Sequence, residues 1–293
     1  MIKDGKAKGK KFLGAREEDG CYKITAGFME VSICKKCGMI KQIVKNHKDI
    51  LRAPSKLNIY RAPLDNDRNI DVEWKKYGFN DPTIKHYSHR VIDNGEDITV
   101  IFELGLTSDN VPEIARVKLI YKFYPSEDIH VELKAHIGSN MPFLPRFGIR
   151  FFLDDEFENL KYYGYGPFES YIDKHQASYI DLFTSTVTDE HEDYIMPQEN
   201  GSHFKTEYLT LTSGIQNLNI FSENDFSFSV SHYRQESKIR ADHNYKLVKD
   251  ELTELCIDYM MSGVGSASCG PELKEEYRLN EKDFEYDFWM NIQ

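Results

Sequence analysis

A strict alternation of apolar and polar residues is the feature that most constrains the fold of this 293-residue chain. Between residues 128 and 137, every second residue is apolar and the residues between them are polar or charged. A period of two is typical of a β-strand that buries one face. The segments 98–106, 116–124, 146–153, 204–211, 226–231 and 254–261 continue the pattern, and residues 125–128 predict a hairpin turn. The sequence therefore predicts an all-β, antiparallel protein.

Signals for helices are few. Residues 71–77 predict about two helical turns and residues 170–179 a short helical piece, while no long segment shows a period near 3.6. Many strands joined by Gly, Pro and Asn turns favour a large sandwich or a barrel. There is no internal repeat and no linker-like stretch after residue 12. We therefore expect a basic leader or linker remnant at 1–15 and a single β domain at 16–293.

Charge and cysteine content limit the partners and the compartment. The formal net charge of −11 argues against a nucleic-acid partner, which needs clustered Lys and Arg. The basic run 3–11 has no apolar segment behind it, so it does not predict a signal peptide, and no stretch approaches the roughly 18 apolar residues of a membrane-spanning helix. Five cysteines without a secretion signal indicate a reducing compartment. We expect a soluble, cytoplasmic protein without a membrane partner.

Cys34 and Cys37 have the spacing of a zinc-ribbon pair. A structural zinc site usually needs two such pairs, and here the remaining ligands would have to be Cys21 or a distant histidine. The alternative is that Cys34 and Cys37 flank a turn at Gly38 between two strands. We favour the turn and expect no metal site in this chain.

Two polar clusters lie in predicted loops. Asp65, Asn66 and Asp67 follow a predicted strand, where they could bind a cation or sugar hydroxyls. A turn whose side chains bond the local backbone explains them as well, and we favour it. Glu199 and Asn200 precede Gly201, which predicts a turn with some capacity for recognition, although a plain loop is the simpler interpretation.

Two further loops carry aromatic or small residues. The segment 163–171 presents Tyr165, Phe168 and Glu169, which suit either stacking on a sugar or a contact with another subunit. The segment 263–271 carries three glycines and places Cys269 at its tip, but it lacks the lysine and the following helix of a phosphate-binding loop. A glycosidase needs two carboxylates about 5–9 Å apart, and no such pair can be chosen from the sequence. We therefore assign no catalytic residue.

The order of these motifs resembles one family. GMI at 38–40, RAPLDND at 61–67, LPRFG at 144–148, the 163–171 loop, MPQENG at 196–201 and GVGSASCGPEL at 263–273 are similar to the C-terminal small-chain domain (domain 5) of family-2 glycoside hydrolase β-galactosidases, over roughly residues 20–290. The resemblance implies a large antiparallel β super-sandwich similar to that of galactose mutarotases. It also implies that the chain belongs to an enzyme that hydrolyses terminal β-D-galactosides such as lactose. The two catalytic glutamates, and the Mg and Na ions, are then expected on a separate barrel, so that this chain alone is inactive and holds no cofactor.

The same resemblance implies a role for one loop. In the family, the loop that matches 263–271 reaches into the sugar site of the barrel, and some members place a Trp there where this chain has Cys269. Ser268 and Cys269 are thus expected to line the substrate pocket, with looser packing of the aglycone. The implied partners are the catalytic barrel, which would cover an exposed Tyr- and Phe-rich face, the galactoside substrate, and further copies in an oligomer.

Two other functions stay open. The first is a stand-alone carbohydrate-binding or aldose-epimerase-like protein on the same fold, with His175 and Glu169 as candidates for the general acid and base. The second is a structural β domain without a sugar contact.

Overall fold

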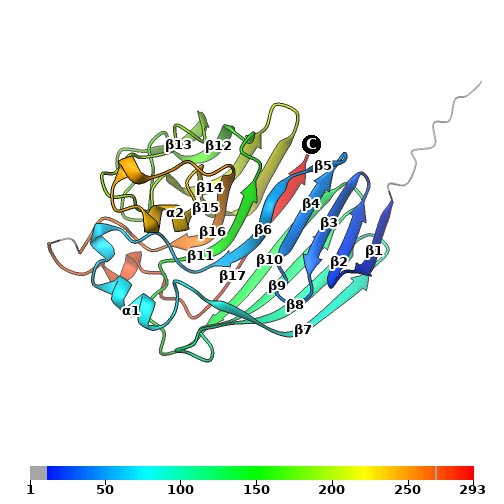
Figure 1. Cartoon of the computed structure of the whole chain (residues 1–293), viewed down its shortest axis with the longest axis horizontal. Helices are drawn as coiled ribbons and strands as arrows, with labels where there is room; N and C mark the ends of the chain where they lie inside the picture. Colours follow the sequence, from blue (N-terminus) through cyan, green and yellow to red (C-terminus); the bar gives the residue numbers. More distant parts are fainter. Residues whose placement is uncertain (1–11, 268) are drawn as a thin grey trace, which may run out of the picture.

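The computed structural model describes residues 12–267 and 269–293, which form two antiparallel sheets (Figure 1). The smaller sheet has five strands in chain order: β1 (Leu13–Glu18), β2 (Cys21–Ala26), β3 (Met29–Cys34), β4 (Ile40–Lys45) and β5 (Lys48–Asp49). The larger sheet has twelve: β6 (Leu51–Asn58), β7 (Thr83–Asp93), β8 (Ile98–Thr107), β9 (Ala115–Phe123), β10 (Asp128–Ile137), β11 (Arg146–Leu153), β12 (Asn159–Gly166), β13 (Tyr179–Thr186), β14 (Ser202–Thr212), β15 (Asn217–Ser231), β16 (Thr253–Met261) and β17 (Asp283–Ile292).

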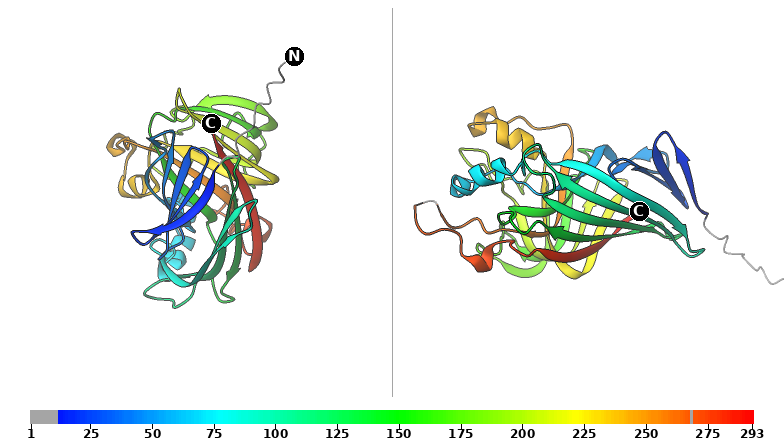
Figure 2. Two further views of the ribbon diagram at one scale, coloured as in Figure 1. Left: turned by 90° about the vertical axis from the view of Figure 1, so that its right-hand side faces the viewer. Right: turned by 90° about the horizontal axis from the view of Figure 1, so that it is seen from below.

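The long strand β15 joins the two parts of the larger sheet. Its first half, Leu218 to Phe221, pairs with β17, and its second half, Ser227 to Ser231, pairs with β16. From β17 the sheet continues through β10, β9 and β8 to β7, whereas from β16 it continues through β11 to β6. Strand β6 lies beside β4 of the smaller sheet. The chain therefore forms two layers connected through β15, as the views in Figures 1 and 2 show.

The core lies between these layers, and the period of two explains why. In β10 the alternate residues Ile129, Val131, Leu133, Ala135 and Ile137 are buried, as the sequence predicts. They belong to one apolar cluster with buried residues of β2, β3 and β4 on the smaller sheet. The hydroxyl of Tyr121 donates to the carbonyl of Gly38 at 3.0 Å across the layers. The expected all-β, antiparallel super-sandwich is thus confirmed.

The last strand of the chain lies in the interior of the larger sheet. β17 pairs with β10 along nine consecutive residues on one side, and with β15 on the other. The turn at residues 125–128 that joins β9 to β10 was also predicted correctly: the amide of Glu127 donates to Tyr124 O at 2.9 Å. The central strands are therefore connected both by this local turn and by pairing over long sequence separations.

The helices are short. α1 (Ile70–Lys76) agrees with the prediction for 71–77, with acidic side chains in its first turn and Lys75 and Lys76 in its last, which complements the helix dipole. α2 (Gln235–Arg240) and the 3-10 helices η1 (Asp65–Asp67), η2 (Asn244–Lys246) and η3 (Glu275–Tyr277) complete the set in the described part. No helix there is long and apolar enough to cross a membrane.

The helical piece predicted for residues 170–179 was wrong. This segment forms turns and a single bridge between Tyr171 and Lys174. Its side chains bond to distant loops, as described below, and these tertiary contacts override a weak local preference. The basic leader expected at 1–15 lies outside the described residues up to position 11, and β1 begins at Leu13.

Candidate functional site

Four segments that the sequence analysis selected lie together at one end of the sandwich, beside α1 (Figure 1). In the structure, the selected segments 163–171 and 263–271 continue into neighbouring loop residues. We call the region made of residues 61–67, 163–175, 196–201 and 262–273 the loop end. The 61–67 segment follows β6 and contains η1, and the 263–273 segment follows β16. Figure 2 shows the latter projecting from the molecule at the end away from β1.

The guanidinium of Arg61 holds two of these segments together. Its side chain is fully buried and bonds both carboxylate oxygens of Asp67, at 2.9 and 2.7 Å. It also donates to the carbonyl oxygens of Ser262 at 2.6 Å and Gly263 at 3.1 Å. A guanidinium has five donors in a fixed plane, which suits this combination of a carboxylate and two carbonyls. Arg61 therefore fixes where the 263–273 loop begins.

Two further side chains hold the first residues of that loop. The side-chain amide of Asn66 donates through Nδ2 to Val264 O at 2.5 Å. The carboxylate of Asp173 accepts from the amides of Val264 at 2.9 Å and Gly265 at 2.8 Å. A Cβ on Gly263 would stand 2.5 Å from Asp173 Oδ2, so this close approach requires glycine. Asp65, Asn66 and Asp67 thus belong to a structured turn. Asn66 bonds Val264, about 200 positions away in the sequence, whereas Asp67 acts through Arg61.

A small apolar cluster lies beneath the loop end. Tyr171, Met261 and Val264 are buried against one another, and Leu64 packs on them. Three of the four segments contribute to it, directly or through the last residue of β16. The loops are therefore supported by packing as well as by hydrogen bonds.

Glu169 joins the second segment to the third. Its carboxylate accepts from the amide of Gly201 at 2.9 Å and from the hydroxyls of Tyr171 and Tyr194, and it pairs with the ammonium of Lys174. Burial alone would raise the pKa of Glu169, but the bonds from Lys174, Tyr194 and Gly201 outweigh burial and lower it. Glu169 is therefore an ionised acceptor with all its capacity in use, which is unlike a general acid poised to donate a proton.

The ring of His175 does not complete an acid–base pair with Glu169. Its Nδ1 lies 2.9 Å from Tyr171 O, and its ring packs against Tyr165 and Phe204 at centroid distances of 5.2 and 5.8 Å. Phe168 lies on the surface. The structure thus brings Tyr165, Phe168, Glu169 and His175 into one region, but as packing and hydrogen-bonding groups.

Glu199 takes part in a buried charge cluster below the loops. Arg146 Nη1 donates to Glu199 Oε2 at 3.0 Å, and Arg146 Nε donates to Asp258 Oδ2 at 3.1 Å. Burial raises the pKa of Asp258 to about 6, although Arg146 acts in the opposite direction. The amide of Glu199 also donates to Ala62 O at 3.0 Å, and Asn200 donates to Gln198 O at 2.8 Å. The 196–201 segment is therefore tied to both the core and the 61–67 segment.

The sequence analysis missed Asp173 and Arg146. A signal existed for Arg146, because two arginines, Arg146 and Arg150, interrupt an otherwise apolar strand that is buried along its whole length. Charged residues in such a strand indicate buried ion pairs. Asp173 has no comparable signal, since its partners lie about ninety residues further along the chain.

A hollow of about 430 Å³ opens at the base of the projecting loop. It lies between η1, the start of α1, Phe143 and the two arms of the loop, with Asn66, Ser266 and Glu272 among its walls. Cys269 is exposed at the tip of the loop, and Ser268 lies outside the described residues. The loop end thus presents a firmly held base, a hollow and a projecting tip.

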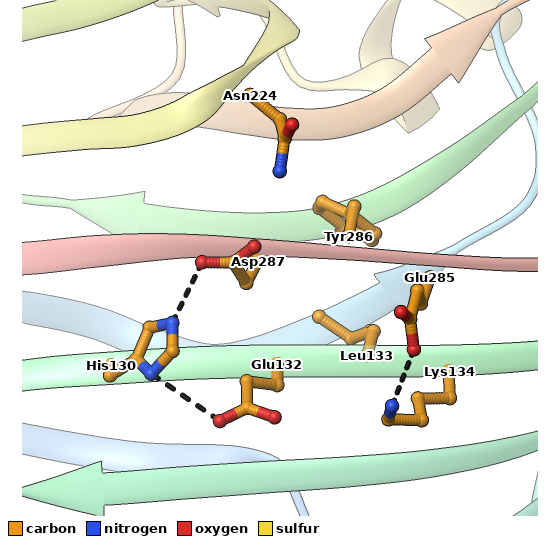
Figure 3. A pocket seen from close by; sticks show the side chains of 8 residues that line it. All are labelled: His130, Glu132, Leu133, Lys134, Asn224, Glu285, Tyr286 and Asp287. Carbon is orange, nitrogen blue, oxygen red and sulfur yellow. Dashed lines mark hydrogen bonds and ion pairs between the residues drawn. The ribbon is translucent and has the colours of Figure 1, made fainter.

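A second hollow, of about 320 Å³, lies on the open face of the larger sheet over β10 and β17 (Figure 3). Its carboxylates are paired: Asp287 with His130 at 2.7 Å, Glu285 with Lys134, and Glu132 with Lys122. Such cross-strand pairs are typical of a solvated sheet face. They do not form the free pair of carboxylates that glycoside hydrolysis requires.

Metal ligation finds no support in the described part of the chain, where no group of three or more His, Cys, Asp or Glu side chains is arranged to hold an ion. Cys34 ends β3, and β4 begins at Ile40, so the predicted turn between two strands is present.

These features define an all-β domain that presents a supported loop. The family model described as "Beta galactosidase small chain" matches residues 25–290, and the chain belongs to this family. The resemblance noted from the motifs is thereby confirmed.

Two β-galactosidases illustrate the relationship. The enzyme of Staphylococcus xylosus is 35% identical over 273 residues, which cover 93% of this chain and 28% of the relative. The enzyme of Actinobacillus pleuropneumoniae is 36% identical over 262 residues, covering 89% of this chain and 26% of the relative. The chain thus spans about a quarter of the length of the relatives it matches.

One solved structure supports the fold alone. A TPR-domain containing protein from Parabacteroides distasonis superposes with a TM-score of 0.50 at 8% identity, over 93% of this chain and 47% of that one. An aldose epimerase homologue from C. elegans gives a TM-score of 0.48 at 10% identity, over 96% and 99% of the two chains. At such distances the likeness carries no functional meaning.

Proposed function

We propose that this chain is the C-terminal domain or small subunit of a β-galactosidase, an enzyme that hydrolyses terminal β-D-galactosides such as lactose. The catalytic glutamates belong to a separate barrel, which this chain completes and helps to assemble. The proposal is supported by family membership and by relatives named β-galactosidase, of which the match covers 28% and 26%. We also propose a cytoplasmic location and an oligomeric complete enzyme, with Mg and Na ions bound on the barrel.

The observation that carries the proposal is the construction of the loop end. Buried Arg61 and the partly buried Asn66 and Asp173 fix the base of the 263–273 loop, while Cys269 is exposed. A loop held this way retains its direction without a partner, so that docking does not have to supply the energy of ordering its base. In the complete enzyme, this loop brings Ser268 and Cys269 to the wall of the galactoside pocket.

An exposed apolar patch at the edge of the larger sheet provides a docking surface for the barrel portion. Phe168, Tyr179, Ile180 and Leu182 are 58%, 57%, 47% and 51% exposed, and three of them lie on the edge strand β13. Ile180 and Leu182 project from one face of β13, and Tyr179 projects from the other, where its ring packs on Phe183. Exposed apolar side chains on an edge strand favour an interaction site. Burying them contributes about 25 cal/mol per Å² before the costs of association.

The stand-alone epimerase is the weaker alternative. It needs a general acid and base that converge on a sugar, and both oxygens of Glu169 are already occupied while His175 bonds Tyr171 O.

The test is complementation. The purified chain is assayed with o-nitrophenyl β-D-galactopyranoside, alone and after mixing with the part of the Staphylococcus xylosus enzyme that lies outside its match to this chain. That fragment mixed with its own matching segment serves as the positive control. We expect no hydrolysis by the chain alone and hydrolysis by the mixture.

Matched variants locate the docking surface. Leu182→Asp places a charge in the exposed patch, and Phe28→Asp places one at the turn between β2 and β3, where Phe28 is 77% exposed. We expect Leu182→Asp to raise the concentration needed for half-maximal activity and Phe28→Asp to leave it unchanged. The proposal would be refuted by hydrolysis with the chain alone, or by a mixture that shows no hydrolysis while the positive control is active.

A further inference from the structure

Three of the five cysteines lie close together at one end of the strands of the smaller sheet. Cys21 begins β2, Cys34 ends β3, and the two are register partners. The backbone amide of Lys35 donates to Gly20 O at 3.0 Å, which makes Gly20 and Lys35 a hydrogen-bonded pair. Because the two kinds of pair alternate along antiparallel strands, Cys21 and Cys34 form a non-hydrogen-bonded pair. Side chains are closest in such pairs. Cys37 follows in the turn that leads to β4.

The turn folds Cys37 back over Cys34. The amide of Gly38 donates to Cys34 O at 2.8 Å, and the amide of Cys34 donates to Met39 O at 3.0 Å. Gly38 has a φ of +71°, and a Cβ at this position would lie 3.0 Å from the ring of Phe102, so that glycine is required on both counts. Cys34 and Cys37 line the same hollow. The pair is therefore pre-arranged by the backbone.

The surroundings of the two thiols are cationic. They line a hollow of about 680 Å³ together with three ammonium groups, those of Lys35, Lys36 and Lys41, and one carboxylate, that of Asp19. Lys35 pairs with Glu17, whereas Lys36 and Lys41 make no ion pair with any described residue. A hollow with unpaired ammonium groups attracts anions and stabilises a thiolate.

The two thiols differ in acidity. Burial opposes ionisation of Cys34, but the Cys37 thiol, the amides of Lys36 and Cys37 and the ammonium of Lys41 outweigh burial, and the pKa of Cys34 is lowered. Burial raises the pKa of Cys37 to about 11. Cys34 is therefore suited to be the attacking thiolate, and Cys37 is suited to be the resolving thiol, which stays protonated until a mixed disulfide has formed on Cys34.

We propose that Cys34 and Cys37 form a thiol–disulfide exchange site for anionic low-molecular-weight disulfides. The Cys34 thiolate attacks one sulfur of the small disulfide, whose S–S bond breaks and releases one thiolate. The Cys37 thiol then gives its proton to solvent and attacks Cys34 Sγ, which releases the second thiolate. Two protein thiols are oxidised to one disulfide, and one small disulfide is reduced to two thiols.

The other cysteines are less suited to this chemistry. Cys256 is buried, and burial raises its pKa to about 12. Cys269 is exposed but lies on the projecting loop, far along the chain from the cluster. A metal site is the competing use of clustered thiols, and no described group of three ligands is arranged for one.

The test uses the reduced full chain in mixtures of glutathione and glutathione disulfide, followed by acid quenching, alkylation and tryptic mass mapping. Lys35 and Lys36 lie between the two cysteines, so trypsin separates them unless a disulfide links the fragments. We expect the linked fragments from the wild type and from Cys269→Ser. Cys37→Ser should instead accumulate a glutathione adduct on Cys34, because the resolving thiol is gone.

A second comparison tests the cationic hollow. We expect the double replacement Lys36→Gln and Lys41→Gln to slow oxidation by glutathione disulfide more than oxidation by the uncharged hydroxyethyl disulfide. An equal effect on both reagents would show that the hollow has no preference for anionic disulfides, which would refute that part of the proposal. A linked pair of Cys21 and Cys34, or an adduct on Cys34 that is as abundant in the wild type as in Cys37→Ser, would overturn the exchange site itself.

Discussion

Replacing Arg61 with methionine tests how the projecting loop is supported. The Arg61 side chain is fully buried and makes two bonds to Asp67 and two to carbonyls at the start of the loop. The replacement leaves the Asp67 carboxylate, whose side chain is 6% exposed, without its cation. Removal of one partner from a buried ion pair costs about 3–5 kcal/mol, and we expect a loss of about 4 kcal/mol in the free energy of unfolding.

The assay is urea denaturation followed by circular dichroism, read as a midpoint and a slope. The double variant Arg61→Met/Asp67→Leu should lose less than the sum of the two single variants, by about 2 kcal/mol, because it leaves no unpaired charge. Arg16→Met is the matched control, since Arg16 pairs with Glu30 on the surface and is 50% exposed. It should leave the midpoint unchanged.

Hydrogen exchange connects this stability to the loop. In Arg61→Met, the amides of Val264 and Gly265 should exchange faster, although their acceptor Asp173 is intact. A loss below about 1 kcal/mol, or additive effects in the double variant, would refute the view that Arg61 and Asp67 support the loop as a buried pair.

Three further outcomes are expected. The pKa of Asp258 is raised to about 6, so the folded state binds this proton more tightly than the unfolded state does. The stabilisation from the bound proton is present below about pH 4 and is lost as the pH rises through 6, by roughly 3 kcal/mol. Asp258→Asn should therefore flatten the fall in urea midpoint over this window, and an unchanged fall would contradict this role of Asp258. Gly263→Ala places a Cβ 2.5 Å from Asp173 Oδ2, whereas Gly265→Ala places one at 3.3 Å, so the first should lower the thermal midpoint more; equal effects would argue against the close approach. In the complementing mixture, Cys269→Trp should change KM or acceptor preference without changing the midpoint, and identical kinetics would remove Cys269 from the pocket wall.

The fold was predictable because its signal is local. The alternation in 128–137 and the turn that precedes it specify a strand and its buried face within ten residues. The acidic start and basic end of 70–76 specify a helix in the same way. By contrast, residues 170–179 carry no strong preference, and bonds of Glu169 to Gly201, of Asp173 to Val264 and of Lys174 to Tyr194 decide their conformation.

The candidate site was predictable in its segments but not in its contacts. The 61–67, 163–171, 196–201 and 263–271 segments stood out because strand periodicity does not explain them. That Arg61 would bond Ser262 and Gly263, about two hundred residues away, follows only from the sheet order that brings β6 and β16 to either side of β11. The spacing of these residues in the sequence does not predict that contact.

The interior position of β17 has a consequence for how the molecule is made. Residues 283–292 lie between β10 and β15 in the sheet. Strand β15 ends about sixty residues, and strand β10 about one hundred and fifty residues, before the end of β17. Until residues 283–292 leave the ribosome, β10 and β15 each have an unpaired edge, and such edges pair with other chains. Contacts of this separation also slow folding. Deletion of residues 283–292 would therefore divide the sheet in its interior and expose both edges.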